Sequence, residues 1–236
     1  MRSRQFAVVI PAYQEAATIG AIVAGCCAAA DVVEVIVVDD GSADATAERA
    51  QAAGARVLRN AGNQGKGASL ARGLAEAMAL DVDWVVTLDG DGQHRPEDFF
   101  LLFACARANP ESIIIGSRRA DRGAAPRARY IANRVADFWV SLASGHAVDD
   151  SQSGFRVYPT ALLRRLGGGA GMAKRFAFES EMLIEAGRLG VSTVAVPIPS
   201  IYTKLQRHSH FRPVLDITRI VFMVAGKLRL VRRSRH

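Results

Sequence analysis

Two aspartates, Asp89 and Asp91, stand two positions apart at the end of an apolar run, in the stretch Asp-Gly-Asp-Gly-Gln-His. A buried strand that ends in paired acids places negative charge at the edge where an open α/β sheet binds ligands. Mg²⁺ is commonly held by one or two carboxylates together with the phosphates of a substrate. The pair therefore indicates a metal and diphosphate centre, and the alternative is a polar turn that closes a strand.

Three common nucleotide or metal signatures are missing from the chain. The segment Gly65-Lys66-Gly67 lacks the earlier glycine and the following serine or threonine of a Walker loop. No Gly-x-Gly-x-x-Gly occurs, and a loop counted from Asp89 has Phe100 at the twelfth position, where an EF-hand needs an acid. The strand-end aspartates therefore belong to another kind of site.

The elements that must position these acids alternate along the chain. Apolar runs predict strands over 6–10, 32–38, 56–59, 84–88 and 112–116, and helical patterns lie between them over 18–30, 43–53, 67–80 and 96–108. Such alternation is typical of a parallel sheet covered on both faces. After residue 116 the pattern loosens into a basic loop over 118–128, helices over 129–143 and 178–189, and a strand over 191–198.

The composition is that of one soluble domain. The chain has 236 residues, half of them hydrophobic, and a net charge of +7. Its three cysteines show neither a disulfide framework nor a zinc spacing, and no apolar run reaches the length of a membrane span. We therefore expect a cytoplasmic protein.

The last segment, 213–236, has an amphipathic and basic pattern. Its apolar residues follow alternating spacings of three and four, which predicts one helical stripe: Val214, Ile217, Val221, Val224, Leu228 and Val231. Five basic residues lie within the last ten positions. Such a helix fits an anionic membrane surface, and the alternative is packing on the domain or on a second subunit. We expect no nucleic-acid partner.

Six short motifs occur in a fixed order. They are Pro-Ala-Tyr-Gln-Glu at 11–15, Val-Asp-Asp-Gly-Ser at 38–42, Asn-Gln-Gly-Lys-Gly at 63–67, Asp-Gly-Asp-Gly-Gln-His at 89–94, Gly-Ser-Arg at 116–118 and Ser-Gly-Phe-Arg at 153–156. This series resembles the family-two inverting glycosyltransferases of the GT-A fold, in particular the dolichyl-phosphate mannose and glucose synthases and their bacterial relatives. The resemblance implies an α/β GT-A domain over 1–212, followed by the basic tail.

The resemblance also implies a nucleoside-diphosphate sugar as donor and Mg²⁺ or Mn²⁺ as the metal. By resemblance, the nucleotide site is lined by Pro11, Ala12, Tyr13, Glu15, Asp40, Lys66 and Asp89, and the metal is bound by Asp89, Asp91 and Gln93. The carboxylate of Asp40 is suited to accept a hydrogen bond from a base N–H, and its alternative role is to cap the following helix. Lys66 could reach a base or a phosphate.

The acceptor decides which further residues the reaction needs. A hydroxyl acceptor must lose a proton to a carboxylate, whereas a phosphate monoester is already anionic and needs cations to hold it. Arg118, Arg129 and Arg156 match basic positions in the polyprenyl-phosphate branch. Asp150 and Glu181 could each act as a base or orient one of these arginines.

The sequence thus predicts a metal-dependent glycosyltransferase that acts on a polyprenyl phosphate or another membrane-associated acceptor, at the inner face of the cell membrane. A hydroxyl acceptor in polysaccharide, glycolipid or secondary-metabolite synthesis is the alternative. Two other classes are a nucleotidyltransferase and a non-catalytic nucleotide-sugar-binding protein. The first normally has a loop rich in glycine and basic residues after the first strand, and 12–17 contains neither. Ser209-His210-Phe211 resembles a variant found in small soluble bacterial members of the family. The sequence does not identify the sugar or the nucleotide base of the donor.

Overall fold

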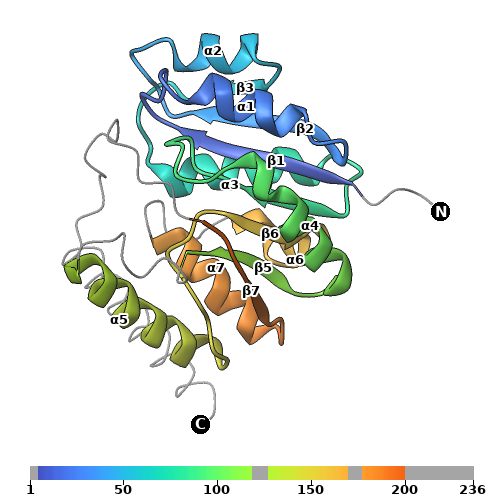
Figure 1. Cartoon of the computed structure of the whole chain (residues 1–236), viewed down its shortest axis with the longest axis vertical. Helices are drawn as coiled ribbons and strands as arrows, with labels where there is room; N and C mark the ends of the chain where they lie inside the picture. Colours follow the sequence, from blue (N-terminus) through green and yellow to red (C-terminus); the bar gives the residue numbers. More distant parts are fainter. Residues whose placement is uncertain (1–4, 119–126, 170–176, 200–236) are drawn as a thin grey trace.

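The computed structural model describes residues 5–118, 127–169 and 177–199, without the side chains of 127–129 and 177. Within these ranges the chain forms one sheet flanked by helices (Figure 1). The predicted tail 213–236, and with it the segment 209–211, lies outside the described residues. No helix in the described ranges is both long and apolar enough to cross a bilayer.

The sheet has seven strands in the order β3-β2-β1-β4-β6-β5-β7. Their bounds are β1 Phe6–Ala12, β2 Val32–Asp39, β3 Arg56–Arg59, β4 Trp84–Thr87, β5 Ile113–Ser117, β6 Arg156–Pro159 and β7 Thr193–Pro197. All neighbours pair in parallel except β6, which runs antiparallel to both β4 and β5. The mostly parallel sheet that the sequence predicts is therefore confirmed.

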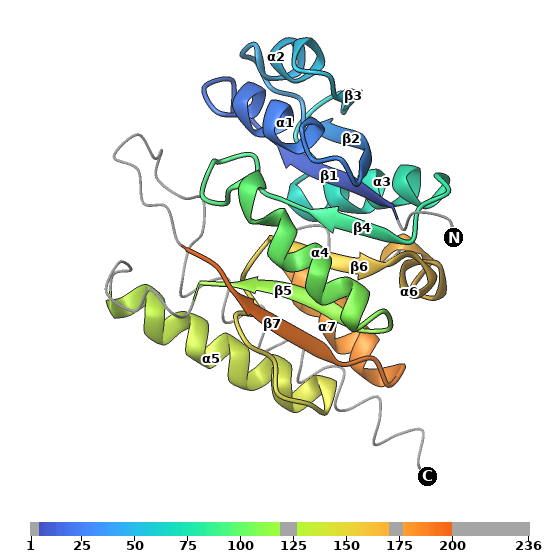
Figure 2. The same ribbon diagram turned by 45° about the vertical axis from the view of Figure 1, so that its right-hand side comes forward.

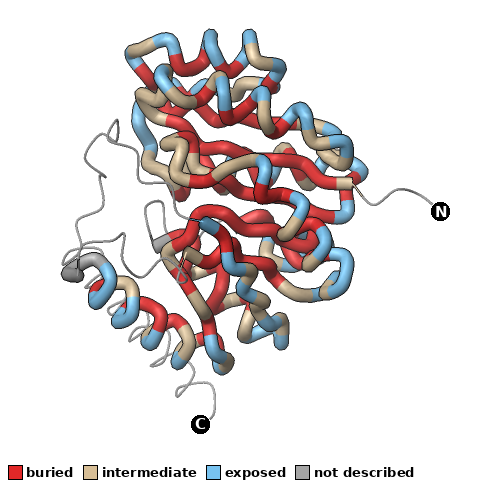
Figure 3. The backbone as a smooth tube through the Cα atoms, in the orientation of Figure 1, coloured by how far each residue is buried: buried red, intermediate tan, exposed pale blue. Residues whose placement is uncertain are grey.

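Helices cover both faces of the sheet, because successive residues of each buried strand point to opposite faces. Val8 and Ile10 pack with α1 (Ile19–Cys27), α2 (Thr46–Ala52) and α4 (Phe99–Ala108). Ala7 and Val9 pack with the helices of the other face, α3 (Lys66–Met78), α5 (Arg127–Ser144), α6 (Thr160–Arg165) and α7 (Ala177–Arg188). Figure 2 shows these two layers on either side of the strands, and Figure 3 shows that the strands form the buried centre.

The structure differs from the predicted elements in three places. β1 continues through Pro11, which pairs with Val38 at the end of a neighbouring strand. The helix predicted over 96–108 begins with a 3-10 turn, η1 (Pro96–Asp98), and a second such turn, η2 (Gly167–Gly169), follows α6. The sequence pattern does not predict β6, because its four residues Arg-Val-Tyr-Pro show neither an apolar run nor alternation.

Candidate active site

Asp89 lies at the carboxyl end of β4, against the loop that leads into β6. The hydroxyl of Thr87, the last residue of β4, donates to the carbonyl oxygen of Gly154 at 2.9 Å. A Cβ atom at Gly154 would overlap both oxygens of the Asp89 carboxylate. The glycine therefore allows the carboxylate to lie directly on the backbone of this loop.

Lys66 joins Asp89 to a second acid. Its Nζ lies 2.7 Å from Oδ1 of Asp89 and 3.1 Å from Oε2 of Glu179, which stands in the first turn of α7. Burial alone would lower the pKa of Lys66, but the two carboxylates raise it above its usual value. Burial would likewise raise the pKa of Asp89, and the Lys66 ammonium reverses this shift, so the pKa is lowered. Both groups are therefore charged at neutral pH.

Asp91 lies in a different environment from Asp89. It accepts a hydrogen bond from the backbone N–H of Gln93 at 3.0 Å. Burial and the neighbouring charge of Asp89 raise its pKa. The loop between the two acids is held by Thr18, whose hydroxyl donates to the carbonyl oxygen of Gly90 at 2.6 Å.

The two acids fit a divalent cation that is bound jointly with a phosphate ligand. The raised pKa of Asp91 shows that its charge lacks full compensation beside Asp89, which a divalent cation would supply. The described ranges contain no group of three or more His, Cys, Asp or Glu side chains arranged to hold a metal. The two acids would hold the cation together with the phosphates of a substrate, as in many Mg²⁺ sites.

Arg118 and Asp150 form the opposite side of the site. Asp150 Oδ2 accepts hydrogen bonds from the backbone N–H of Arg118 at 2.9 Å and from its Nε at 3.4 Å. Arg118 Nη1 also donates to Oε1 of Gln93 at 3.4 Å, so the side chain of this predicted metal ligand contacts an arginine. Burial would raise the pKa of Asp150, but Arg118 lowers it. Of the two roles considered for Asp150, the structure shows the orientation of an arginine.

Arg156 is placed differently from the cation expected on the acceptor side. Its side chain is fully buried, and its guanidinium donates to four oxygens inside the fold. These are the carbonyl oxygens of Ser151, Ser153 and Glu179, at 2.7, 2.8 and 2.7 Å, and the Tyr158 hydroxyl at 3.2 Å. Arg156 therefore ties the loop before β6 to α7 and presents no charge to solvent.

The remaining two acceptor-side candidates are Arg129 and Glu181. The side chain of Arg129 lies outside the described residues. Glu181 is partly exposed on α7, and the acid that contacts Lys66 is Glu179, two positions earlier. Residues two apart on a helix point in very different directions, so the helix can turn only one of them to Lys66.

His94, like Glu179, is a residue of this site for which the sequence did not predict a role. Its ring is buried against Phe155, with centroids 5.4 Å apart, and neither ring nitrogen has a hydrogen-bond partner. Burial, followed by the charge of Arg118, lowers its pKa to about 3. His94 is therefore neutral beside the two aspartates. Its place directly after Gln93 in the motif was the available signal.

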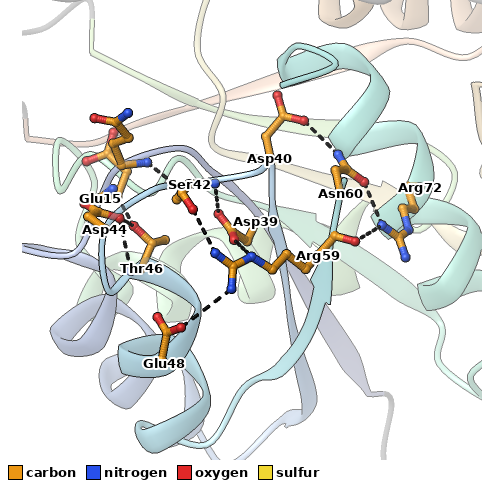
Figure 4. A network of polar contacts seen from close by, with 11 residues as sticks. Glu15, Asp39, Asp40, Ser42, Asp44, Thr46, Glu48, Arg59, Asn60 and Arg72 are labelled. Carbon is orange, nitrogen blue, oxygen red and sulfur yellow. Dashed lines mark hydrogen bonds and ion pairs between the residues drawn. The ribbon is translucent and has the colours of Figure 1, made fainter. Parts of the chain in front are cut away.

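Asp40 anchors the segment that leads to Lys66. Its Oδ1 accepts from Nδ2 of Asn60 at 2.7 Å and from the N–H of Gln64 at 2.9 Å, and its Oδ2 accepts from the N–H of Gly65 at 2.8 Å. Figure 4 shows Asp40 directed at Asn60, which in turn contacts Arg72. Asp40 thus shapes the loop before α3 and does not cap α2.

The segment 11–15, at the end of β1, contacts the segment 40–46 that follows β2. The N–H of Asp40 donates to the carbonyl oxygen of Ala12 at 2.8 Å. The N–H of Gln14 donates to the Ser42 hydroxyl at 2.8 Å, and that of Glu15 to the Thr46 hydroxyl at 2.8 Å (Figure 4). Pro11 and Ala12 are buried, whereas Tyr13 and Glu15 are partly exposed beside them. The sheet therefore brings these predicted nucleotide-site residues to one edge.

Comparison with known families decides which class of protein carries this arrangement. The model of glycosyl transferase family 2 matches residues 7–166. The chain belongs to this family. The family predicted from the ordered motifs is confirmed, as are the GT-A fold and the glycosyltransferase class.

Relatives of this family 2 member include proteins with different acceptors in their names. An uncharacterized protein of Methanocaldococcus jannaschii is 32% identical over 200 residues, covering 84% of this chain and 82% of its own. Undecaprenyl-phosphate mannosyltransferase of Micrococcus luteus is 28% identical, covering 84% of each chain. Glucosyl-3-phosphoglycerate synthase of Mycobacterium tuberculosis, solved with Mn²⁺, uridine diphosphate and phosphoglyceric acid, has a TM-score of 0.68 and 26% identity, covering 95% of this chain and 77% of its own.

Proposed function

We propose that this protein transfers a sugar, with inversion, from a nucleoside-diphosphate sugar to the phosphate of a polyprenyl phosphate, with the help of a divalent metal. The observation that carries this proposal is the juxtaposition of two acids, Asp89 and Asp91, with the cation Lys66 at the end of β4, where Lys66 Nζ lies 2.7 Å from Asp89 Oδ1. Arg118 lies beside this centre and supplies a cation for an anionic acceptor.

On the donor side, each residue would act on one part of the nucleotide. The edge formed by Pro11–Glu15 and the Asp40-anchored loop would receive the base and ribose. Asp89 and Asp91 would hold Mg²⁺ or Mn²⁺, which when bound neutralises charge on the departing diphosphate. Lys66 would contact that diphosphate, and Gln93 would complete the metal site once Arg118 contacts an acceptor. The related synthase solved with Mn²⁺ and uridine diphosphate supports this donor chemistry.

The ion pairs in the site favour a phosphate as the group that receives the sugar. Asp89 and Glu179 both contact Lys66, and Asp150 contacts Arg118. These ion pairs lower the pKa of Asp89 and that of Asp150, so these two carboxylates are weak bases. A phosphate monoester needs no base, so the site can act on it as it stands. The undecaprenyl-phosphate relative agrees with this choice.

A direct assay tests the acceptor. The protein is incubated with Mn²⁺ and radiolabelled UDP- or GDP-sugars, in parallel with undecaprenyl phosphate, the neutral alcohol undecaprenol, or 3-phosphoglycerate. We expect label in the lipid phosphate alone. Transfer to 3-phosphoglycerate alone would support the hydroxyl-acceptor alternative, which the structural neighbour favours. Transfer to none of them, with no binding of any nucleotide, would contradict the proposal.

A lipid acceptor requires contact with a bilayer, and α5 offers a surface for it. Ile131, Val135, Phe138 and Leu142 lie four, three and four residues apart and are 38–61% exposed. Arg134 is exposed on the same helix. Asp137, also on this helix, is buried and accepts a hydrogen bond from the backbone N–H of Ser151 in the loop before β6. An apolar stripe with a basic residue fits an anionic membrane surface. We propose that α5 and the tail 213–236, appended to the domain 1–212, dock together on the inner membrane face.

Vesicle binding tests this docking surface. We expect the double variant Ile131→Ser/Phe138→Ser to co-sediment about tenfold less with vesicles containing anionic lipid. The variant lacks two apolar side chains that the membrane would otherwise bury. The matched control is Phe100→Ser, which removes an exposed aromatic residue on α4, away from α5. Equal sedimentation of the double variant and the wild type would exclude α5 as the docking surface. Removal of 213–236 measures how much the tail contributes to vesicle binding.

A further inference from the structure

Lys66 occupies a coordination position of Asp89. Its ammonium lies 2.7 Å from Oδ1, the distance of a charge-assisted hydrogen bond, and both side chains are largely but not fully buried. A divalent cation at Asp89 and Asp91 would be repelled by the Lys66 ammonium, because both cations would lie next to the same carboxylate and compete for its charge. The Lys66 ammonium therefore supplies at Asp89 the positive charge that a bound metal would supply.

Glu179 holds Lys66 in place from the other side. The Glu179 carboxylate is almost fully buried, and its Oε2 lies 3.1 Å from Nζ of Lys66. Its second oxygen, Oε1, is buried and has no hydrogen-bond partner among the residues that the structure describes. Lys66 forms an ion pair with this carboxylate, and the buried Arg156 adds a second positive charge near it. The carboxylate can therefore keep the ammonium near the site when the contact to Asp89 is broken.

We infer that Lys66 makes metal binding conditional on the donor. Without a nucleotide, Lys66 neutralises Asp89 and weakens the affinity of the acid pair for a divalent cation. When a nucleoside diphosphate binds, Lys66 moves from Asp89 to the diphosphate while Glu179 retains it, and Asp89 becomes free. Metal and nucleotide then bind cooperatively, and each raises the affinity for the other by the same factor. This inference rests on the donor and metal sites of the proposed function.

The test measures the affinity for Mn²⁺ alone, from the concentration of free Mn²⁺ in titrations followed by electron paramagnetic resonance. We expect Lys66→Met to raise this affinity about tenfold and to lower the affinity for UDP or GDP alone. These opposite changes separate the inference from general damage to the fold, which would weaken both. We also expect UDP or GDP to raise Mn²⁺ affinity in the wild type and clearly less in Lys66→Met.

A second variant removes the effect of net charge. Lys66→Met/Glu179→Gln deletes one positive and one negative charge, so the net charge of the protein is unchanged and no carboxylate remains at position 179 without its cation. We expect it too to bind Mn²⁺ alone more tightly than the wild type, because Oδ1 of Asp89 is free. The matched control is Glu185→Gln on α7, whose carboxylate pairs with Arg188 and which should behave as the wild type.

Unchanged or weaker Mn²⁺ binding by both Lys66 variants would overturn the inference. Failure of the proposed function is distinguishable from this result. In that case Asp91→Ala would bind Mn²⁺ in the presence of nucleotide as tightly as the wild type does, because the metal would lie elsewhere.

Discussion

Replacing Asp91 by asparagine is expected to reduce sugar transfer about a thousandfold while leaving the fold at least as stable as in the wild type. The carboxylate is needed to hold the metal that stabilises the departing diphosphate, an effect of several kcal/mol. The raised pKa of Asp91 means that its charge destabilises the folded state at neutral pH. Kinetic assays at saturating Mn²⁺ and thermal unfolding measure the two effects.

The stability change should depend on pH in a defined direction. A carboxyl group whose pKa is raised by folding costs stability as the pH rises from its usual value through the raised one. Asparagine cannot ionise, so the gain from Asp91→Asn should appear at neutral pH and disappear in acid. A melting temperature clearly below that of the wild type at neutral pH, or transfer that stays normal, would contradict the role of Asp91.

Replacing Arg156 by methionine is expected to have the largest effect on stability. The variant would remove the guanidinium donor of three buried carbonyl oxygens, at a cost of about 3–5 kcal/mol. For a chain of this length such a loss lowers the melting temperature by roughly 10 °C. Urea titration followed by circular dichroism measures the free energy of unfolding.

Arg118→Met is the matched comparison. Arg118 is partly exposed and pairs with Asp150, so its loss should cost much less stability but should raise the KM for the acceptor. If Arg156→Met were as stable as the wild type and specifically weakened acceptor binding, the buried arginine would have a direct role that its placement here does not support.

The sequence predicts the strands of the proposed donor side well because their signals are local. Apolar runs mark β1, β2 and β4, and the ends of parallel strands meet at one edge, so Asp40 and Asp89 had to lie near each other. The identity of the acid beside Lys66 is not local. Whether Glu179 or Glu181 faces the site depends on how α7 is rotated against the sheet, and this is set by packing with α3 and α5.

The acceptor side could not be predicted for a related reason. The sequence around an arginine in a glycine-containing motif does not indicate whether its side chain is exposed or buried. Arg156 is buried because it is the first residue of β6, whereas Arg118 lies just after β5. β6 is short, ends in proline and runs against its neighbours, so no periodicity reveals it. Its first residue is therefore placed inside the sheet, where a charged side chain would not be expected.

The reversed direction of β6 separates the parallel strands β3, β2, β1 and β4 from the parallel pair β5 and β7. Arg156, at the start of β6, pairs with Thr87 at the end of β4 and with Ile115 near the end of β5. The loop before β6 therefore enters the ligand edge between two halves, one built from 6–91 and the other from 113–199. Changes in the second half can alter what receives the sugar without disturbing the parallel strands that carry the donor chemistry. This gives a structural reason why proteins similar to this chain carry names with acceptors as unlike as a lipid phosphate and phosphoglycerate.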